Sequence, residues 1–330
     1  MLNKKPQWVQ AHTNIAFIKY WGKKNEELIL PQNNSLSLTL DAFYTQTKVT
    51  FDPQLTEDVL LIDHEVQNEK VLNKAKVILD IVREMAEIKA YAKIESINHV
   101  PTAAGLASSA SGLAALAGAA SLAAGLELSQ TELSRLARRG SGSASRSIYG
   151  GFAEWQQGTS DEDSVAVPID DAKWDIGMIF IIVEDAQKEI SSTEGMRRVV
   201  ETSPYYEGWL SSTTTDLAAI KEAIAEQDLV KVGEISERSA LKMHALNLSA
   251  NPPFNYWTPE TIVAMQKIEA LREQGYPVYL TMDAGPNVKI ICKASQMKEL
   301  QALLLKDYHK DQLVLAKPGP GLQVLEDEME

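Results

Sequence analysis

A run of small residues between Pro101 and Ser111 has the composition of a phosphate-binding loop. It reads PTAAGLASSAS, and it lies between a predicted strand and an alanine-rich helix that begins at about Gly112. Backbone N–H groups and hydroxyls at the positive end of a helix can bind a phosphate. The segment lacks the Gly-Lys-Ser/Thr ending of a Walker A loop, so that motif is excluded. Composition alone leaves a second interpretation open, a tightly packed helix start.

A cluster of basic and aromatic residues, IKYWGKK, occupies residues 18–24. Lys19 and Lys23 carry point charges on flexible stems, and both could neutralise a diphosphate. The alternative is a solvated surface turn, which is the usual position of a charged run. The residues themselves do not decide between the two.

The segment GSGSASRSIYGG, residues 140–151, surrounds a single cation, Arg146, with glycines and hydroxyls. Glycines permit close backbone approach and the hydroxyls are neutral donors, so the loop suits an anion. A flexible connector is the alternative, although linkers seldom place an arginine and a tyrosine among their small residues. The planar guanidinium of Arg146 can bind a carboxylate through two hydrogen bonds and thereby orient it.

Asp283 in the segment TMDAGPN is the best candidate for a general base. It lies at the end of a predicted strand beside turn residues, where an aspartate can also be a simple turn former. The histidines lack the spacing of metal ligands, and we expect core or surface roles for them; they are His12, His64, His99, His244 and His309.

Taken together, these segments resemble a known family. The loop at 101–110 is similar to the phosphate-binding motif of the GHMP kinase superfamily, Pro-x-x-x-Gly-Leu-Gly/Ala-Ser-Ser-Ala. HTNIAFIKYWGK at 12–23, GSGSASRSIYGG at 140–151 and TMDAGPN at 281–287 resemble, in this order, signature stretches of the diphosphomevalonate decarboxylases. The likeness runs from about residue 8 to about residue 293.

The resemblance implies an ATP-dependent decarboxylation with Mg²⁺ as cofactor. Mevalonate 5-diphosphate would be phosphorylated on its C3 hydroxyl and would yield isopentenyl diphosphate, ADP, phosphate and CO₂. Asp283 would face that hydroxyl and take or share its proton, Arg146 would orient the leaving carboxylate, and Lys188 would lie near the transferred phosphoryl group.

The resemblance also implies three sets of binding residues. Substrate contacts are expected from Lys19, Tyr20, Trp21, Gly22, Lys23, Ser141, Gly142, Ser143, Ala144, Ser145, Arg146, Ser192 and Thr193. Nucleotide contacts are expected from Gly105, Leu106, Ala107, Ser108 and Ser109, with Ser96 and Asn98 near the adenosine. Ser108 is the candidate metal ligand. Two rival functions stay open: a GHMP kinase that releases no CO₂, and a noncatalytic nucleotide-binding sensor.

Hydrophobic periodicity predicts the elements that must position these residues. Strands are expected at 34–40 and 45–51, paired with each other, and at 91–100, 176–183, 276–282 and 287–293. Helices are expected at 70–88, 129–139, 211–226, 229–246 and 258–274. Ser129 and Glu132 form a capping-box pair, and Gly140 is a stop signal. The run at 176–183 has the continuous apolar character of a strand buried on both faces.

These elements predict an α+β fold with two lobes. The resemblance implies a GHMP kinase-like fold, with a mixed sheet-and-helix N-terminal lobe that binds the nucleotide and a ferredoxin-like C-terminal lobe. We place the division between residues 1–185 and 186–330, with the active site in the cleft between the lobes. The family resemblance also implies a homodimer.

Composition limits the partners and the location. The chain of 330 residues has 45 acidic and 32 basic side chains, and this net charge of -13 opposes nucleic-acid binding over the whole surface. An anionic ligand therefore needs a local basic pocket. The single cysteine, Cys292, excludes an internal disulfide, and the start has no apolar signal stretch, so a cytoplasmic location is expected. Residues 100–126 lack charge, but their glycines and Pro101 argue against a membrane helix.

Overall fold

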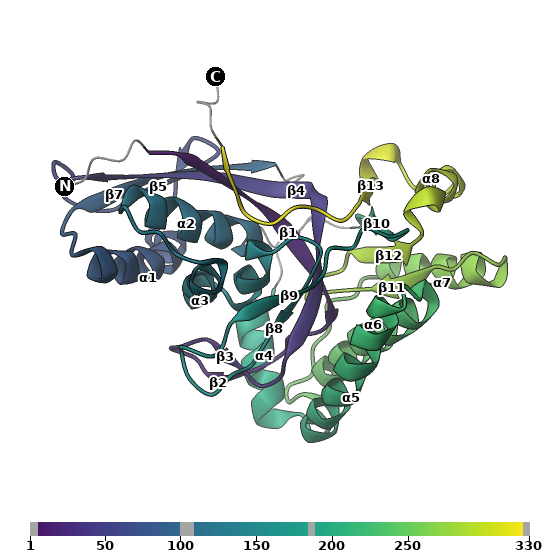
Figure 1. Cartoon of the computed structure of the whole chain (residues 1–330). Helices are drawn as coiled ribbons and strands as arrows, with labels where there is room; N and C mark the ends of the chain where they lie inside the picture. The colour runs from purple at the N-terminus through teal and green to yellow at the C-terminus, as the bar shows by residue number, and fades with distance from the viewer. Residues whose placement is uncertain (1–5, 100–108, 184–188, 326–330) are drawn as a thin grey trace.

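In the computed structural model, two β-sheets and their helices form the body of the molecule (Figure 1). The structure describes residues 6–99, 109–183 and 189–325. One sheet takes most of its strands from the first half of the chain, and the other lies mainly in the second half. A short ribbon of β2 (Lys23–Asn25) and β3 (Leu30–Pro31) forms a third, two-stranded unit.

The larger sheet has eight strands in the order β14-β1-β4-β7-β5-β6, with β8 paired to β4 and β9 paired to β8. Its pairs are antiparallel except for β5 and β7. The strands are β1 (Trp8–Ile18), β4 (Ser35–Asp52), β5 (Val59–Ile62), β6 (Glu65–Val66), β7 (Tyr91–His99), β8 (Phe152–Trp155), β9 (Ala166–Asp170) and β14 (Gln323–Leu325).

The predicted pairing between strands 34–40 and 45–51 is wrong, because both belong to the single strand β4. The intervening residues Asp41 and Ala42 continue the strand instead of reversing the chain. Strand β1 pairs along both halves of β4, with register shifts between His12 and Asn14 and between Ala16 and Ile18. One long partner strand thus satisfies the backbone groups that a hairpin would otherwise pair.

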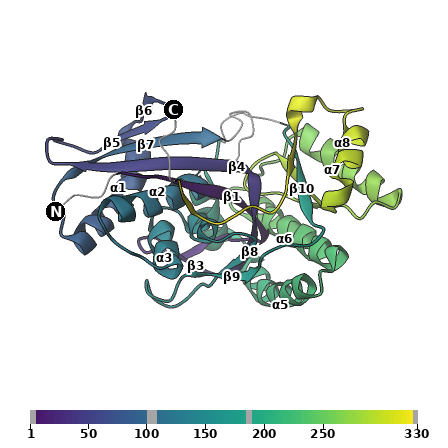
Figure 2. The ribbon, with the colours of Figure 1, turned by 45° about the horizontal axis from the view of Figure 1, so that its top comes forward.

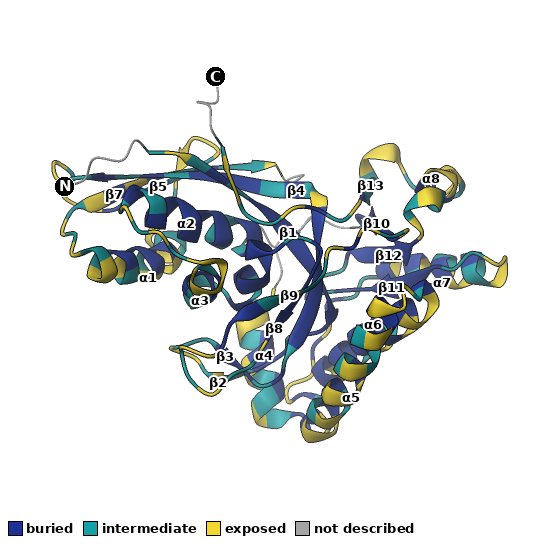
Figure 3. Cartoon of the chain, in the orientation of Figure 1, coloured by how far each residue is buried: buried dark blue, intermediate teal, exposed yellow. Residues whose placement is uncertain are grey.

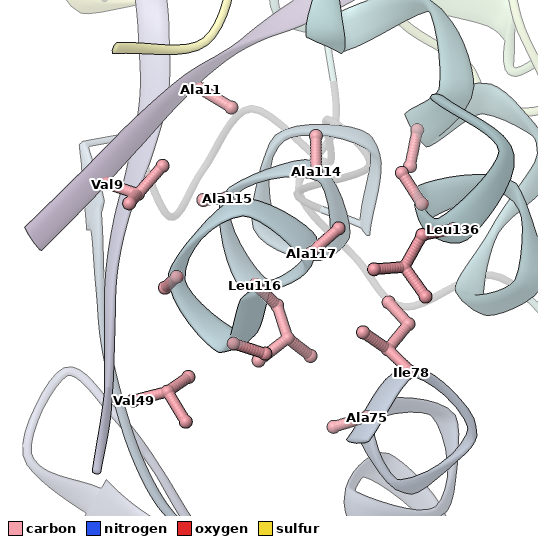
Figure 4. Close-up of a cluster of buried hydrophobic side chains, with 14 of the residues drawn as sticks. Val9, Ala11, Val49, Ala75, Ile78, Ala114, Ala115, Leu116, Ala117 and Leu136 are labelled. Atoms are coloured by element: carbon pink, nitrogen blue, oxygen red, sulfur yellow. The ribbon is translucent and has the colours of Figure 1, made fainter. Parts of the chain in front are cut away.

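Three helices pack beneath one face of the larger sheet (Figure 1). They are α1 (Glu69–Ala86), α2 (Ser109–Ala123) and α3 (Gln130–Gly140). Helix α2 lies between the sheet residues Val9, Ala11 and Val49 and the residues Ile78 and Leu136 of its neighbours (Figure 4). Its alanines let sheet and helices approach closely, which accounts for a buried helix with few large side chains. The predicted capping box between Ser129 and Glu132 is confirmed at the start of α3.

The smaller sheet is antiparallel, with the order β11-β12-β10-β13. Its strands are β10 (Gly177–Ile181), β11 (Tyr279–Thr281), β12 (Val288–Cys292) and β13 (Leu313–Ala316). Met178 and Phe180 of β10 pack into the core with helices α5 and α6, and Ile179 and Ile181 pack into the core with α7 and α8. The predicted burial of this strand on both faces is therefore confirmed.

Helices of the second half cover the two faces of this sheet (Figure 2). They are α5 (Tyr206–Ala225), α6 (Leu229–Ser249), α7 (Pro259–Glu273) and α8 (Met297–Leu304), whereas α4 (Ser192–Thr202) packs against α6 in a separate hydrophobic cluster. Their outward sides are exposed, whereas the strands between them are buried (Figure 3). Helix α4 was not predicted, although Ser191 accepts a hydrogen bond from the backbone of Glu194 and has the sequence spacing of a cap.

The chain crosses between the two sheets more than once. Strand β10 precedes residue 185 and belongs to the smaller sheet, while β14 returns to pair with β1 in the larger one. The division between residues 185 and 186 stays a prediction. Within the described parts of the chain, no helix is both long and apolar enough to cross a bilayer.

Candidate active site

A pocket of about 520 Å³ receives side chains from both halves of the chain. Its walls come from β1, the β2–β3 ribbon, α1, the starts of α2 and α4, the end of α3 with the turn that follows it, helix α6 and the turn between β11 and β12. Among its described residues, six basic side chains face three acidic ones: Lys19, Lys23, Lys74, Arg139, Arg146 and Lys289 against Glu26, Glu27 and Asp283. The pocket is thus a local basic site in an acidic protein, as an anionic ligand requires.

Asp283 follows β11, and two lysines hold its carboxylate. The Nζ of Lys19 donates to Oδ1 at 2.8 Å, and the Nζ of Lys289 donates to Oδ2 at 3.0 Å. Both lysines are buried, whereas the Asp283 side chain keeps 39% of its surface exposed to the pocket. Lys19 also donates to the carbonyl of Ala16 at 2.7 Å. Each carboxylate oxygen is therefore fixed by its own ammonium group, and the carboxylate still faces the pocket.

Burial and the neighbouring charges shift the pKa values of Asp283 and Lys19. Burial alone would raise the pKa of Asp283, but attraction to Lys19 and Lys289 outweighs burial and holds that pKa far below its usual range. Burial lowers the pKa of Lys19 to about 8, against the attraction of Asp283. Asp283 is thus ionised at every working pH, and Lys19 can exchange its proton near neutrality.

Arg146 lies buried in the short 3-10 helix at Gly142–Ile148. Its Nε donates to Ser37 Oγ at 2.9 Å and to Asn14 Oδ1 at 3.3 Å, and its Nη1 donates to Ser35 Oγ. These partners are all neutral. Burial lowers the pKa of the guanidinium to about 10, so it stays charged at neutral pH. A buried cation held by neutral groups favours an anion in the adjoining pocket.

Tyr20 and Lys23 also line the pocket. The Tyr20 hydroxyl is buried without a hydrogen-bond partner among the described residues, and its ring packs edge-on against Trp155. Buried hydroxyls are normally satisfied, so this one suits a polar ligand. Lys23 Nζ lies 2.5 Å from Glu26 Oε2, and a bound anion would compete with that carboxylate.

The predicted contact residues Trp21 and Gly22 connect the pocket with an aromatic cluster. Trp21 lines the pocket and donates through Nε1 to Asn247 Oδ1 at 3.0 Å. Gly22 is not among the lining residues, and its φ of +132° is a conformation that other residues rarely adopt. The Tyr206 hydroxyl occupies the space where a Cβ of residue 22 would lie, and it donates to the Trp21 carbonyl at 2.9 Å.

Replacing Gly22 with alanine is expected to destabilise the protein by about 2 to 4 kcal/mol, because backbone strain and overpacking coincide. A Cβ at this position would lie 2.0 Å from the Tyr206 hydroxyl oxygen. Urea unfolding measures the loss. Gly125→Ala is the matched control, since Gly125 also has a positive φ but nothing within 4 Å of its Cβ. Equal losses in the two variants would show that the collision with Tyr206 has no effect.

Two more predicted substrate segments reach the pocket in part. Ser141, Gly142 and Ser143 line it, and so do Ser192 and Thr193 in the first turn of α4. Ala144 and Ser145 do not line it and are buried within the 3-10 helix. The Ser145 hydroxyl donates to the Gly142 carbonyl at 2.7 Å and so stabilises the turn that carries Arg146.

The structure describes some of the residues that were predicted to bind the nucleotide. Ser109 begins α2 and lines the pocket, so the positive end of this helix faces the pocket. Ser96 and Asn98 lie on β7 outside the described lining of the pocket. Their side chains form hydrogen bonds with those of Thr47 and Thr45, respectively. Their contact with adenosine stays a prediction. The predicted residues Gly105, Leu106, Ala107, Ser108 and Lys188 lie outside the described residues.

Sequence reasoning missed two residues of the site. Lys289 was assigned only to a strand, although a lysine inside the apolar run VKIIC is a signal of a paired, buried charge. Asn14 was quoted only within a longer motif. Its Nδ2 donates to the Ser143 carbonyl at 2.9 Å and to Ser147 Oγ at 2.8 Å, and its Oδ1 receives Arg146. Asn14 therefore connects β1 with the turn that positions the guanidinium.

Comparison with known proteins decides the family. Residues 11–166 match the model of the diphosphomevalonate decarboxylase-like N-terminal domain, and residues 178–319 match that of the mevalonate 5-diphosphate decarboxylase C-terminal domain. The diphosphomevalonate decarboxylase of Ganoderma lucidum is 37% identical to the chain, over 90% of this chain and 80% of that protein. The chain belongs to the diphosphomevalonate decarboxylase family.

Solved structures of this family share the whole fold. The mevalonate diphosphate decarboxylase of Staphylococcus aureus has a TM-score of 0.94 at 49% identity, with 98% of each chain covered. A structure of MDDEF in complex with MVAPP, AMPPCP and magnesium has a TM-score of 0.93 at 52% identity, with 98% of this chain and 99% of that chain covered. The predicted α+β fold and the predicted family are thereby confirmed.

Proposed function

We propose that the chain catalyses the ATP-dependent decarboxylation of mevalonate 5-diphosphate to isopentenyl diphosphate, with ADP, phosphate and CO₂ as the other products. The observation that carries this proposal is the pocket that holds Asp283 and Arg146 together. One is an ionised carboxylate that can accept a hydrogen bond from a hydroxyl, and the other is a buried guanidinium with only neutral hydrogen-bond partners among the described residues. A substrate with an alcohol next to a carboxylate matches this pair.

Asp283 is proposed to align the C3 hydroxyl. Transfer of the γ-phosphoryl group requires the attacking oxygen in line, and little covalent chemistry is needed from the protein. Because the pKa of Asp283 lies far below neutrality, the carboxylate is a weak base and a permanent hydrogen-bond acceptor. We therefore infer that it orients the hydroxyl and shares its proton instead of removing it early.

Arg146 is proposed to orient the substrate carboxylate. Decarboxylation takes the negative charge of that group away, so an ion pair that is strongest in the ground state would oppose the step. The contacts to Ser35, Ser37 and Asn14 fix the guanidinium before the substrate arrives. The main contribution of Arg146 is thus a prepared geometry for the breaking bond.

The described pocket fits nucleotide phosphates. Helix α2 presents its N-terminal end at Ser109 and Ala110, and its first turn contains no acidic residue. Among the described residues, no group of three or more histidine, cysteine or carboxylate side chains is placed so that it could hold a metal ion. A magnesium ion carried on phosphate oxygens fits such a pocket, because Mg²⁺ keeps several waters and binds substrate phosphates. When bound, it neutralises charge on the transferred group.

Simultaneous measurement of ADP and CO₂ tests the proposal. The full chain is incubated with mevalonate 5-diphosphate, ATP and Mg²⁺, and we expect the two products in equal molar amounts. ADP without CO₂ would identify a kinase. Nucleotide binding without either product would identify a sensor and overturn the proposed activity.

The molecular setting is part of the proposal. We infer a role in the mevalonate pathway of lipid precursor synthesis and a homodimeric state from the family resemblance, and a cytoplasmic location from the single cysteine. Sedimentation velocity at several concentrations tests the dimer. A single species of about 36.4 kDa at every concentration would contradict it.

A further inference from the structure

Lys289 is a buried cation for which the proposed reaction has no direct use. It lies in β12 between Val288 and Ile290 with 4% of its surface exposed. Burying an ammonium group is unfavourable unless a partner compensates for the lost hydration. Its partner is the carboxylate of Asp283, whose other oxygen is already held by Lys19. A single lysine would neutralise Asp283, so the second cation needs its own explanation.

We propose that Lys289 is a positioning residue of the active site, which holds the second oxygen of Asp283 and so fixes the orientation of that carboxylate toward the pocket. This inference rests on the proposed role of Asp283. Because each oxygen binds a different ammonium group, rotation of the carboxylate breaks at least one contact. With Lys19 alone, Oδ2 would be free to turn and the alignment of the hydroxyl would loosen.

Lys289 also determines the net charge of the cluster formed by Asp283, Lys19 and Lys289. Two ammonium groups around one carboxylate leave a net positive charge. That excess also affects Lys19, because the nearby Lys289 and Arg146 both lower its pKa. Removal of the Lys289 charge must therefore raise the pKa of both Asp283 and Lys19, since each binds a proton more readily with one positive neighbour fewer.

The remaining ionisable groups around the carboxylate do not obscure this effect. They are Lys19 after β1, Arg146 in the 3-10 helix and His244 of helix α6. Burial, together with Lys19, lowers the pKa of His244 to about 3, so this ring stays neutral. Arg146 stays charged up to about pH 10. Near pH 8, Lys19 is thus the group in this set that titrates.

Lys289→Met tests the proposal, because methionine keeps most of the length of the side chain and removes its charge. We expect kcat at pH 7 to fall at least about tenfold with little change in KM, since alignment is lost and binding is not. We also expect the alkaline limb of the kcat–pH profile to move up by about one pH unit or more. Lys289→Arg keeps a charge and should keep the limb near its original position.

A double-variant comparison separates this inference from the proposed function. If Lys289 acts through Asp283, then Asp283→Asn with Lys289→Met should be no more than about threefold slower than Asp283→Asn alone. The inference would be overturned if the two substitutions lowered kcat by the product of their separate effects. It would also be overturned if the alkaline limb of the kcat–pH profile did not move in Lys289→Met. Near-normal kcat in Asp283→Asn would instead overturn the proposed role of Asp283.

Lys221→Met is the matched control for a merely structural effect. Lys221 also binds a buried carboxylate, with its Nζ 2.7 Å from Glu154 Oε2, and it lies outside the described pocket lining. Its loss should lower the unfolding midpoint without moving the kcat–pH profile. The same pattern in Lys289→Met would assign Lys289 to the core and contradict the proposal.

Discussion

Asparagine in place of Asp283 is expected to lower kcat at least about 100-fold, with little change in the KM of either substrate. The amide keeps the size of the carboxylate but accepts hydrogen bonds more weakly, and it carries no charge to hold Lys19 and Lys289 in place. Asp283 is proposed to align the substrate C3 hydroxyl for phosphoryl transfer. Its replacement should therefore lower kcat and leave substrate binding nearly unchanged. Steady-state kinetics on ADP and CO₂ release measures it.

Asparagine is a better test than alanine at this position. Alanine would leave two buried ammonium groups facing a gap, and the folding cost could mask the catalytic one. Asp216→Asn is the matched control. Asp216 is a buried carboxylate held by Arg238 at 2.9 Å and Lys242 at 2.8 Å, outside the described pocket lining. We expect this variant to lose stability and keep its kcat; an equal fall in kcat would remove the special role of Asp283.

The sequence allowed prediction of the residues whose type already defines a chemistry. Arg146 among glycines and serines, and Asp283 at a strand end, were candidates by residue type, and the family resemblance assigned their roles. The meeting of these residues with Lys19 in one pocket could not be derived from sequence spacing, since Asp283 and Lys19 are 264 positions apart in the chain. The distance between them is set by how the two sheets pack, and that depends on the whole core.

Lys289 was not predicted because the sequence does not show whether a polar residue in a strand faces water or a buried partner. A lysine in a half-exposed strand normally faces water, but β12 is buried along its whole length, between β10 and β11. Its burial depends on a partner from another part of the chain. The single strand β4 escaped prediction for a related reason, because β1, a different part of the chain, pairs with both of its halves.

Lysine in place of Arg146 is expected to lower kcat/KM at least about 100-fold, which corresponds to about 2.7 kcal/mol of transition-state stabilisation. A lysine keeps the charge but cannot donate to Ser35 and Ser37 and still present a planar fork to the substrate carboxylate. Because the serines and Asn14 would lose their donor inside a buried region, the remaining ammonium group should also be less well placed.

The ratio of products distinguishes orientation by Arg146 from simple attraction. Phosphorylation of the C3 hydroxyl does not require an aligned carboxylate, whereas loss of CO₂ does, so ADP should form faster than CO₂ in Arg146→Lys. Arg272→Lys is the control, since Arg272 forms a two-point pair with Glu237 away from the described pocket lining. If both products fall equally in Arg146→Lys, then Arg146 acts before phosphoryl transfer, by holding the substrate, and the proposed orienting role in carbon–carbon bond cleavage is wrong.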